Sequence, residues 1–256
     1  TPYDGDLDDL SVGEEEIRGF LGEVNAAWPG ADVRREDVVF AHVGLVPIEG
    51  ADPSSGRVRR AGHYHIVDHR RHGIAGLFSV LGVKYTTARD VAEKVVDLIF
   101  AGWGKRPPPS RSSTTPLHGG EIERLETFLA TAVAGRPAGL DEQTVRRLVY
   151  NYGTAYAEVL GRLGRADGGL SLDEERVRTA QVLHAVREEM AQKLVDVVFR
   201  RTELGTAGSP EAGALLASAN AMAGELGWSH QRVQQELAEV QEHLARRGSA
   251  PKGVEA

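Results

Sequence analysis

One stretch decides how this chain folds: it reads Gly82-Val83-Lys84-Tyr85-Thr86-Thr87-Ala88-Arg89 and joins an apolar, strand-like run to an amphipathic helix. Thr87 stands where it can cap that helix, and the free backbone N–H groups of a helix start suit an anionic or polar ligand. Lys84 adds a cation, and Thr86 adds a second hydroxyl. On this pattern alone, an ordinary helix start with a surface lysine is the simpler interpretation.

Length and composition exclude several classes of protein. The 256 residues are 41% hydrophobic and 26% charged, which is typical of a globular protein. A formal net charge of −7 gives no general attraction for nucleic acid, so no nucleic-acid partner is expected. The absence of cysteine excludes disulfides, thiolate metal sites and cysteine nucleophiles. No apolar run approaches the ~20 residues of a transmembrane helix. We expect a cytoplasmic protein, with peripheral membrane contact and oligomerisation left open.

The first 104 residues are predicted to combine helices with a small sheet. A capping box, Ser11 with Glu14, predicts the start of a helix that Pro29-Gly30 ends. A second helix is expected to follow Thr87 and to reach Trp103. Runs of β-branched and apolar residues predict three successive strands, at 38–43, 63–69 and 74–81.

The rest of the chain has a helical pattern. Residues 105–120 contain three consecutive prolines and a Ser/Thr cluster, a composition typical of an extended linker. Helical segments are predicted at 121–134, 141–151, 153–163, 172–204 and 210–246, the last broken at Gly227-Trp228. Within 172–204 one stripe is expected to face the core, formed by Leu183, Val186, Met190, Leu194 and Val197. We therefore predict an α+β fold with one domain at 1–104, a linker at 105–120, an all-α domain at 121–247 and a tail at 248–256.

The opening stretch resembles a run found in the FAD-dependent glycerol-3-phosphate dehydrogenases. In that family Gly-Gly-Lys-aromatic-Thr-Thr-Tyr-Arg follows a strand and precedes a helix, as residues 82–89 are predicted to do here. Further similar runs follow the family's order, at 3–6, 38–48, 185–191, 196–202 and 226–228. Each match is modest, but together they cover nearly the whole chain.

The resemblance implies the C-terminal part of a flavin- and substrate-binding domain, followed by the family's helical C-terminal domain. It implies FAD as cofactor, and oxidation of an alcohol by hydride transfer to flavin with electrons passed to an acceptor such as a quinone. Glycerol 3-phosphate or a related hydroxy compound is the implied substrate. The dinucleotide fingerprint Gly-x-Gly-x-x-Gly is absent from the sequence. We therefore expect a few hundred residues before Thr1, and no activity from this chain alone.

The resemblance also assigns roles to residues of the opening stretch. It implies that Lys84 lies close to flavin and substrate as a catalytic cation. Gly82, Lys84, Thr86 and Thr87 are the implied cofactor-binding residues. The second glycine of the family's run is Val83 here, which is expected to crowd a close backbone approach.

Two arginines that hold the substrate's anionic end in the family have no direct counterpart. Val46 stands at one of these positions and Gly62 at the other, with Arg60 two residues away as a substitute. Each lost charge-assisted hydrogen bond removes roughly 1.5–3 kcal/mol. Substrate recognition is therefore expected to differ, and His63 or His65 is predicted to contact the substrate instead.

Histidines at short spacing also raise the question of a metal site, because nitrogen ligands suit zinc or nickel. No cysteine or acidic pair supports His63, His65, His69 and His72, so no metal is predicted. Two alternatives to the dehydrogenase remain. One is a non-catalytic helical interaction module with a vestigial flavin-domain remnant, and the other is a flavoenzyme with a non-phosphorylated substrate.

Overall fold

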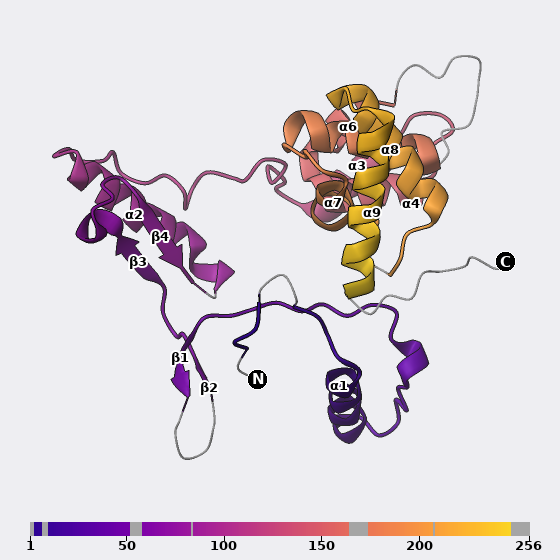
Figure 1. The fold of residues 1–256 in the computed structure, drawn as a ribbon. Helices are drawn as coiled ribbons and strands as arrows, with labels where there is room; N and C mark the ends of the chain where they lie inside the picture. Colours follow the sequence, from indigo (N-terminus) through magenta and orange to yellow (C-terminus); the bar gives the residue numbers. More distant parts are fainter. Residues whose placement is uncertain are drawn as a thin grey trace. The chain divides into compact units, whose positions relative to one another are not determined.

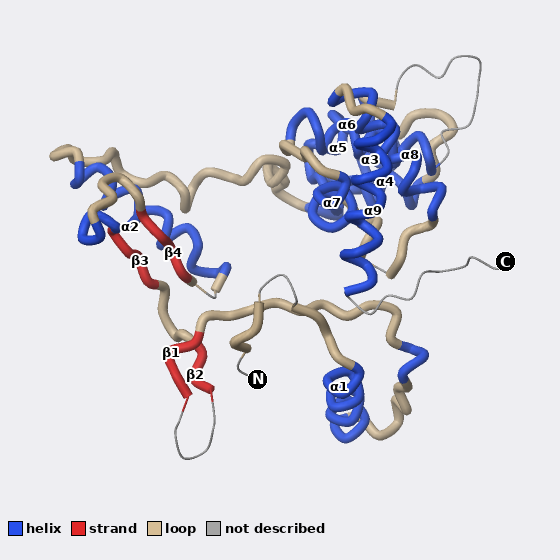
Figure 2. The backbone as a smooth tube through the Cα atoms, viewed as in Figure 1, coloured by secondary structure: helices blue, strands red, loops and turns tan. Residues whose placement is uncertain are grey.

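The computed structural model describes residues 3–6, 10–51, 58–82, 84–163, 174–206 and 208–246. The chain forms two compact units. The first unit consists of Thr1–Leu7 and Gly44–Pro116, and the second of Asp8–Val43 and Leu117–Ala256. The labelled strands and α2 belong to the first unit, and the other labelled helices belong to the second (Figures 1 and 2). The fold is thus α+β with a helical C-terminal domain, as predicted.

The first unit contains two separate antiparallel pairs of strands. Strand β1 (Ile48–Ala51) pairs with β2 (Val58–Arg60), and β3 (His65–Asp68) pairs with β4 (Phe78–Leu81). The β3–β4 pair confirms two predicted strands in shortened form. The β1–β2 pair was not predicted, because its two strands are only four and three residues long. The expected small sheet is therefore divided into two pairs.

Helix α2 (Ala88–Gly102) closes the first unit and ends before Trp103, as predicted. A 3-10 turn, Tyr85–Thr87, leads into it. The Lys94 ammonium lies 5.2 Å from the centre of the Tyr64 ring, a cation–π contact between α2 and the segment before β3. This contact helps to fix one face of α2 beside β3 and β4.

The strand predicted at 38–43 does not form. Val39 is 59% exposed, and no described residue pairs with this segment in a sheet. Phe40 packs instead against the core of the helical unit. A β-branched run has the local preference for a strand, but a strand also needs a hydrogen-bonded neighbour.

In the second unit, all the described helices except the first pack around two buried clusters. The helices are α1 (Glu14–Ala27), α3 (Leu125–Ala134), α4 (Glu142–Tyr152), α5 (Tyr156–Gly161), α6 (Glu174–Glu188), α7 (Leu194–Asp196), α8 (Ala212–Leu226) and α9 (His230–Arg246). One cluster draws on α3, α4, α5 and the first half of α6, and the other on the second half of α6 with α7, α8 and α9. Asp141 caps α4, because its Oδ1 accepts a hydrogen bond of 2.8 Å from the Thr144 N–H.

Helix α1 begins two residues later than its predicted capping box implies. Gly13 precedes it, and the Gly13 N–H donates to Glu16 Oε2 at 3.0 Å. The predicted box of Ser11 and Glu14 is therefore wrong. The Glu14 carboxylate, which the predicted box needs, forms an ion pair with Arg35 instead: Arg35 Nη2 lies 2.8 Å from Glu14 Oε1.

The long helix predicted at 172–204 is also wrong, because α6 ends at Glu188 and α7 begins at Leu194. Met190, expected in the buried stripe, has φ 59° and is 80% exposed. A non-glycine residue at positive φ cannot continue a helix. The break rotates the stripe, so that Leu194 is still buried but Met190 faces outward.

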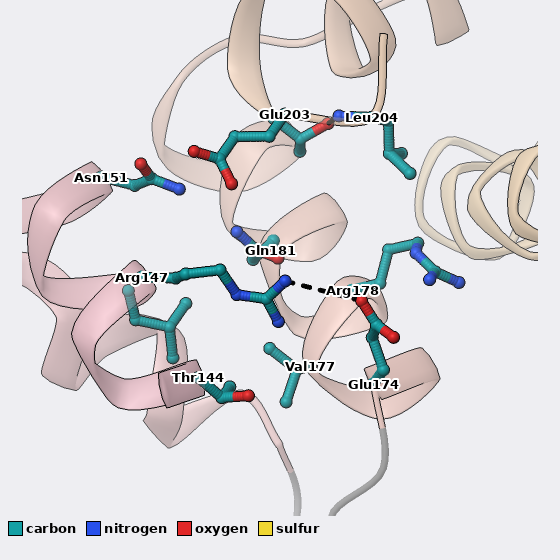
Figure 3. Close-up of a pocket in the computed structure, with 11 residues that line it drawn as sticks. Thr144, Arg147, Asn151, Glu174, Val177, Arg178, Gln181, Glu203 and Leu204 are labelled. Atoms are coloured by element: carbon teal, nitrogen blue, oxygen red, sulfur yellow. Dashed lines mark hydrogen bonds and ion pairs between the residues drawn. The ribbon is translucent and has the colours of Figure 1, made fainter. Parts of the chain in front are cut away.

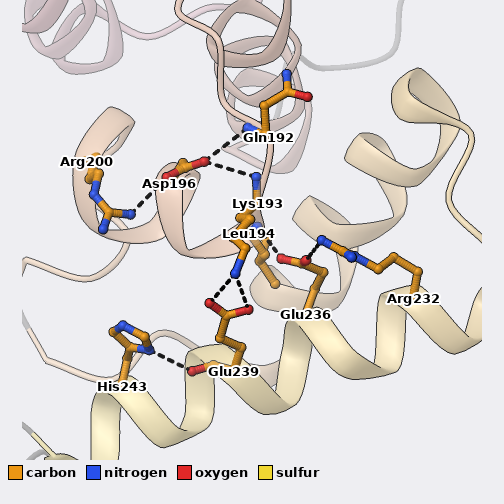
Figure 4. A network of polar contacts seen from close by, with 9 residues as sticks. All are labelled: Gln192, Lys193, Leu194, Asp196, Arg200, Arg232, Glu236, Glu239 and His243. Atoms are coloured by element: carbon orange, nitrogen blue, oxygen red, sulfur yellow. Dashed lines mark hydrogen bonds and ion pairs between the residues drawn. The ribbon is translucent and has the colours of Figure 1, made fainter. Parts of the chain in front are cut away.

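Acidic side chains stabilise the new helix start at α7 (Figure 4). The Leu194 N–H donates to Glu236 Oε2 at 2.8 Å, and the Lys193 N–H donates to Asp196 Oδ2 at 3.0 Å. Glu236 lies on α9, is buried, and also forms an ion pair with Arg232. A long-range cap of this kind stabilises a helix start that local sequence does not reveal.

Candidate functional site

The stretch that opens α2 lies at a pocket of about 880 Å³ in the first unit. Its walls come from the segment before β1, the segment before β3, β4, the 82–88 turn and one face of α2. The lining residues are Leu45, Val46, Pro47, Gly62, His63, Tyr64, Val80, Gly82, Lys84, Tyr85, Thr87, Ala88, Val91, Ala92, Val95 and Val96. The pocket is therefore mainly apolar, with a few polar groups near the start of α2.

The 82–88 turn is closed by hydrogen bonds to the Lys84 carbonyl. The Thr87 N–H donates to this oxygen at 3.4 Å, and the Thr87 hydroxyl donates to it at 3.1 Å. The hydroxyl therefore does not cap α2, although Thr87 occupies the N-cap position. A Cβ at Gly82 would lie 3.6 Å from the Tyr64 Cβ, which is an ordinary contact. Space alone does not require glycine there.

Two lysines of the first unit have different surroundings. Lys94 Nζ lies 2.8 Å from Asp90 Oδ2 in an ion pair one helical turn apart. The Asp90 carboxylate, followed by the Tyr64 hydroxyl, raises the pKa of Lys94. Lys84 lines the pocket, and no described residue forms an ion pair with it. Its charge is thus available to a ligand.

The structure gathers part of the predicted site at this pocket. Gly82, Lys84, Thr87 and His63 all line it. Thr86 belongs to the same 3-10 turn but is not part of the lining.

Other predicted site residues lie elsewhere or are not described. His65 is on β3 opposite Leu81, outside the lining. Arg60 ends β2, and its side chain lies outside what the structure describes, as does the whole of Val83. Val46 and Gly62, which the resemblance places at two arginine positions of the family, both line the pocket.

The four histidines of the possible metal site are not gathered. His69 Nε2 lies 2.8 Å from the Ser79 hydroxyl, and the His69 and His72 rings are 5.4 Å apart. His63 lines the pocket, whereas His69 and His72 do not. Over the described ranges, no group of three or more His, Asp or Glu side chains could hold a metal ion.

Sequence reasoning missed the apolar wall of the pocket as part of a site. Ala88, Val91, Ala92 and Val95 recur at helical spacing, so a signal for one common face exists. That signal predicts burial against a core, and it does not distinguish a core from a pocket wall. Nothing in the sequence around Tyr64 indicated that this residue would line the pocket.

A second, smaller pocket lies in the helical unit (Figure 3). It has a volume of about 150 Å³ and lies between α4, α6 and residues 202–204. Arg147 Nη1 lies 3.6 Å from Glu174 Oε1 across it. None of the predicted site residues lines this pocket.

Comparison with known proteins agrees with the two-part fold. Residues 110–233 match the family described as the C-terminal domain of alpha-glycerophosphate oxidase. A glycerol-3-phosphate dehydrogenase of Synechocystis is 29% identical over 249 residues, which are 94% of this chain and 44% of that protein. A glycerol-3-phosphate dehydrogenase of Pseudomonas aeruginosa is 31% identical, over 81% of this chain and 40% of that protein.

A solved structure shows the same fold. The glycerol-3-phosphate dehydrogenase of Bacillus halodurans, determined in complex with FAD, superposes with a TM-score of 0.73 at 24% identity. The match covers 99% of this chain and 49% of that one. The chain thus spans less than half of each of these relatives.

These findings first define a class: an α+β unit followed by a helical domain of the alpha-glycerophosphate oxidase type. More particularly, the chain is homologous to the C-terminal part of the glycerol-3-phosphate dehydrogenases. Within the described residues, no helix combines the length and the apolarity needed to cross a lipid bilayer.

Proposed function

We propose that this chain is the C-terminal part of an FAD-dependent oxidoreductase that oxidises the hydroxyl group of a small substrate. The observation that carries the proposal is the pocket at the start of α2, which brings Gly82, Lys84 and Thr87 together beneath an apolar wall. Homology to the glycerol-3-phosphate dehydrogenases, one of them solved with FAD, supports the same assignment.

The pocket fits one part of FAD and not another. An apolar cavity of about 880 Å³ with a few polar groups suits a flat ring system together with a small substrate. The pyrophosphate of FAD needs a glycine-rich strand-to-helix turn, and this chain has no Gly-x-Gly-x-x-Gly run. The residues present therefore contribute to the ring and substrate side of a flavin site only.

Within this proposal the chain's own residues bind and orient. Lys84 supplies a fixed cation close to the reacting groups, where it stabilises negative charge that develops on substrate or cofactor. Val46, Val80 and Val91 exclude water from one side of the pocket. A bound FAD would supply the redox chemistry, namely hydride acceptance from the hydroxyl carbon and delivery of the electrons to an acceptor such as a quinone.

A non-catalytic interaction module is the second candidate. The observation that favours it is that Val46 and Gly62 both line the pocket, since the resemblance implies substrate-binding arginines at these two positions. Such a module would keep the fold of the family without its chemistry.

One measurement separates the two candidates. The intact protein is purified without added cofactor, and its absorbance near 450 nm is recorded before and after denaturation. A flavin released on denaturation, together with bleaching by a hydroxy substrate under anaerobic conditions, supports the oxidoreductase. A folded protein that is colourless and gains no absorbance when supplied with FAD supports the interaction module and refutes the proposed function.

A further inference from the structure

We infer that this pocket selects a hydroxy compound with an apolar body and at most one negative charge, such as a 2-hydroxy carboxylate, over a phosphate monoester. The inference rests on the proposed function and names the substrate class of the same site. It follows from the charge and the polarity of the described lining residues.

The described lining residues bring little positive charge to the pocket, and the side chains of Arg59 and Arg60 lie outside what the structure describes. Of the described residues that line it, Lys84 alone carries a permanent charge. The start of α2, where Thr87 and Ala88 meet the pocket, adds about half a positive charge from the helix dipole. A phosphate monoester carries roughly −1.5 to −2 charges at neutral pH, whereas a carboxylate carries one. Lys84 with the helix start therefore matches a carboxylate better.

Two potential anion donors of the pocket are already occupied. The Gly62 N–H donates to Glu49 Oε1 at 3.1 Å, which also brings a carboxylate to this rim of the pocket. The Thr87 hydroxyl donates to the Lys84 carbonyl at 3.1 Å. These two donors are therefore not offered to the three acceptor oxygens of a phosphate, and anionic oxygens that stay unpaired are costly to desolvate.

The apolar residues of the lining favour an apolar group. Val46 lines the pocket from the loop before β1 and Val80 from β4, and α2 contributes Val91, Val95 and Val96. Removal of apolar surface from water is favourable in proportion to its area, so a branched hydrocarbon group gains affinity here that glycerol cannot gain. A ligand whose carboxylate lies at Lys84 and whose hydrocarbon group lies at the valines interacts favourably with both the charged and the apolar residues of the lining.

The test uses the intact protein and two probes, 2-hydroxy-4-methylpentanoate and sn-glycerol 3-phosphate. Calorimetry measures the dissociation constant of each probe, and anaerobic mixing measures how fast each one bleaches bound flavin. We expect the hydroxy acid to bind at least about tenfold more tightly. Lys84→Met should remove most of that affinity.

Two arginine variants should reverse the preference. Val46 is 49% exposed, and a Cβ at Gly62 would have no atom within 4 Å, so both positions have room for a longer side chain. Val46→Arg and, independently, Gly62→Arg should each raise affinity for glycerol 3-phosphate by about tenfold or more. Leu98→Arg is the matched control, because Leu98 is exposed on α2 outside the lining.

The outcomes separate this inference from the proposed function. Tighter binding of glycerol 3-phosphate by the unmodified protein overturns the inference, as does an equal gain from Leu98→Arg and the two pocket variants. A colourless protein refutes the proposed function, yet calorimetry still decides which probe the pocket prefers. A flavin-loaded protein that glycerol 3-phosphate bleaches faster refutes the inference alone.

Discussion

Lys84 and Lys94 are both exposed lysines of the first unit, but only one of them lines the pocket. Lys94 is held by Asp90 at 2.8 Å, whereas Lys84 lies in the lining with no described ion-pair partner. Lys84→Met is therefore expected to slow flavin reduction in the intact protein by about a hundredfold to a thousandfold, the range for loss of one electrostatic contact to the reacting groups. Stopped-flow absorbance at 450 nm measures the rate.

Lys94→Met is the matched control for that experiment. It removes the same charge from the same unit. Lys94 lies outside the lining, where it pairs with Asp90 and contacts the ring of the lining residue Tyr64. Its reduction rate should stay within about twofold of the unmodified protein, since an exposed ion pair contributes little. Equal rates for the two variants would remove Lys84 from the site.

Tyr152 and His184 are two groups of the helical unit whose pKa values are shifted by burial. Their rings meet edge to face with centroids 5.3 Å apart. Burial raises the pKa of Tyr152 to about 12 and lowers the pKa of His184. Below about pH 6.5 the unfolded histidine binds a proton that the folded one resists, so stability falls as the pH decreases. Above about pH 10 the unfolded tyrosine loses a proton that the folded one keeps, so stability falls as the pH rises toward 12.

Hydrogen exchange can test this pH dependence. The protection of amides in α4 and α6, corrected for the intrinsic exchange rate, should be greatest between about pH 6.5 and pH 10. His184→Gln should reduce the loss on the acid side, because glutamine does not titrate. His118→Gln should leave that loss unchanged, since His118 is exposed. If His184→Gln loses as much protection at low pH as the unmodified protein does, His184 is not the cause of that loss.

At the scale of elements, α9 holds the start of α7 through one buried side chain. Glu236 accepts a hydrogen bond from the Leu194 N–H and pairs with Arg232 (Figure 4). Glu236→Ala leaves the buried Leu194 N–H without its acceptor, whereas the partly exposed Arg232 can turn to water. The free energy of unfolding should therefore fall by about 2 kcal/mol. Urea denaturation followed by circular dichroism of the helices measures the change.

Glu239 provides the comparison on the same helix. It pairs with Lys193 at 2.8 Å, but both side chains are partly exposed. Glu239→Ala should therefore cost less than about 1 kcal/mol. If the two variants lose equal stability, burial of Glu236 is not what stabilises the helix start.

The sequence predicted correctly those features that depend on residues close together in the chain. The extent of α2 and the Asp141 cap follow from apolar spacing and a capping residue, and the structure confirms both. The turn at Gly82 was likewise found from the sequence, and the structure places Lys84 and Thr87 from it at the pocket.

What the sequence missed depends on contacts between distant residues. The cap at Ser11 fails because Glu14 pairs with Arg35, and the break at Met190 accompanies a helix start held by Glu236. The run at 38–43 lacks a strand to pair with among the described residues. The pocket wall on α2 has the same spacing as a buried helix face, so its use as a lining could not be read from periodicity.

At the scale of the whole molecule, the two units differ in how much apolar surface they bury. Among the described residues of the first unit, only Ala61 and Val91 are buried hydrophobic side chains, at 5% and 9% exposure. Val80 and Leu81 of β4 are exposed, together with Leu98 and Trp103 at the far end of α2. The helical unit has two extensive buried clusters instead. The first unit therefore has little hydrophobic stabilisation of its own, and its stability depends on what covers β3, β4 and α2.

This difference predicts how the 256-residue chain exchanges its amides. Amides of β3, β4 and α2 should exchange at least about a hundredfold faster than those of α4, α6 and α8, because local opening costs less where few apolar contacts form. In the intact protein, bound flavin should protect α2 more than α8, since only α2 lines the pocket. Uniform protection across both units in the 256-residue chain would show that the first unit is stable without a cover, and the exposed valines around Lys84 would then form a surface rather than one wall of a larger site.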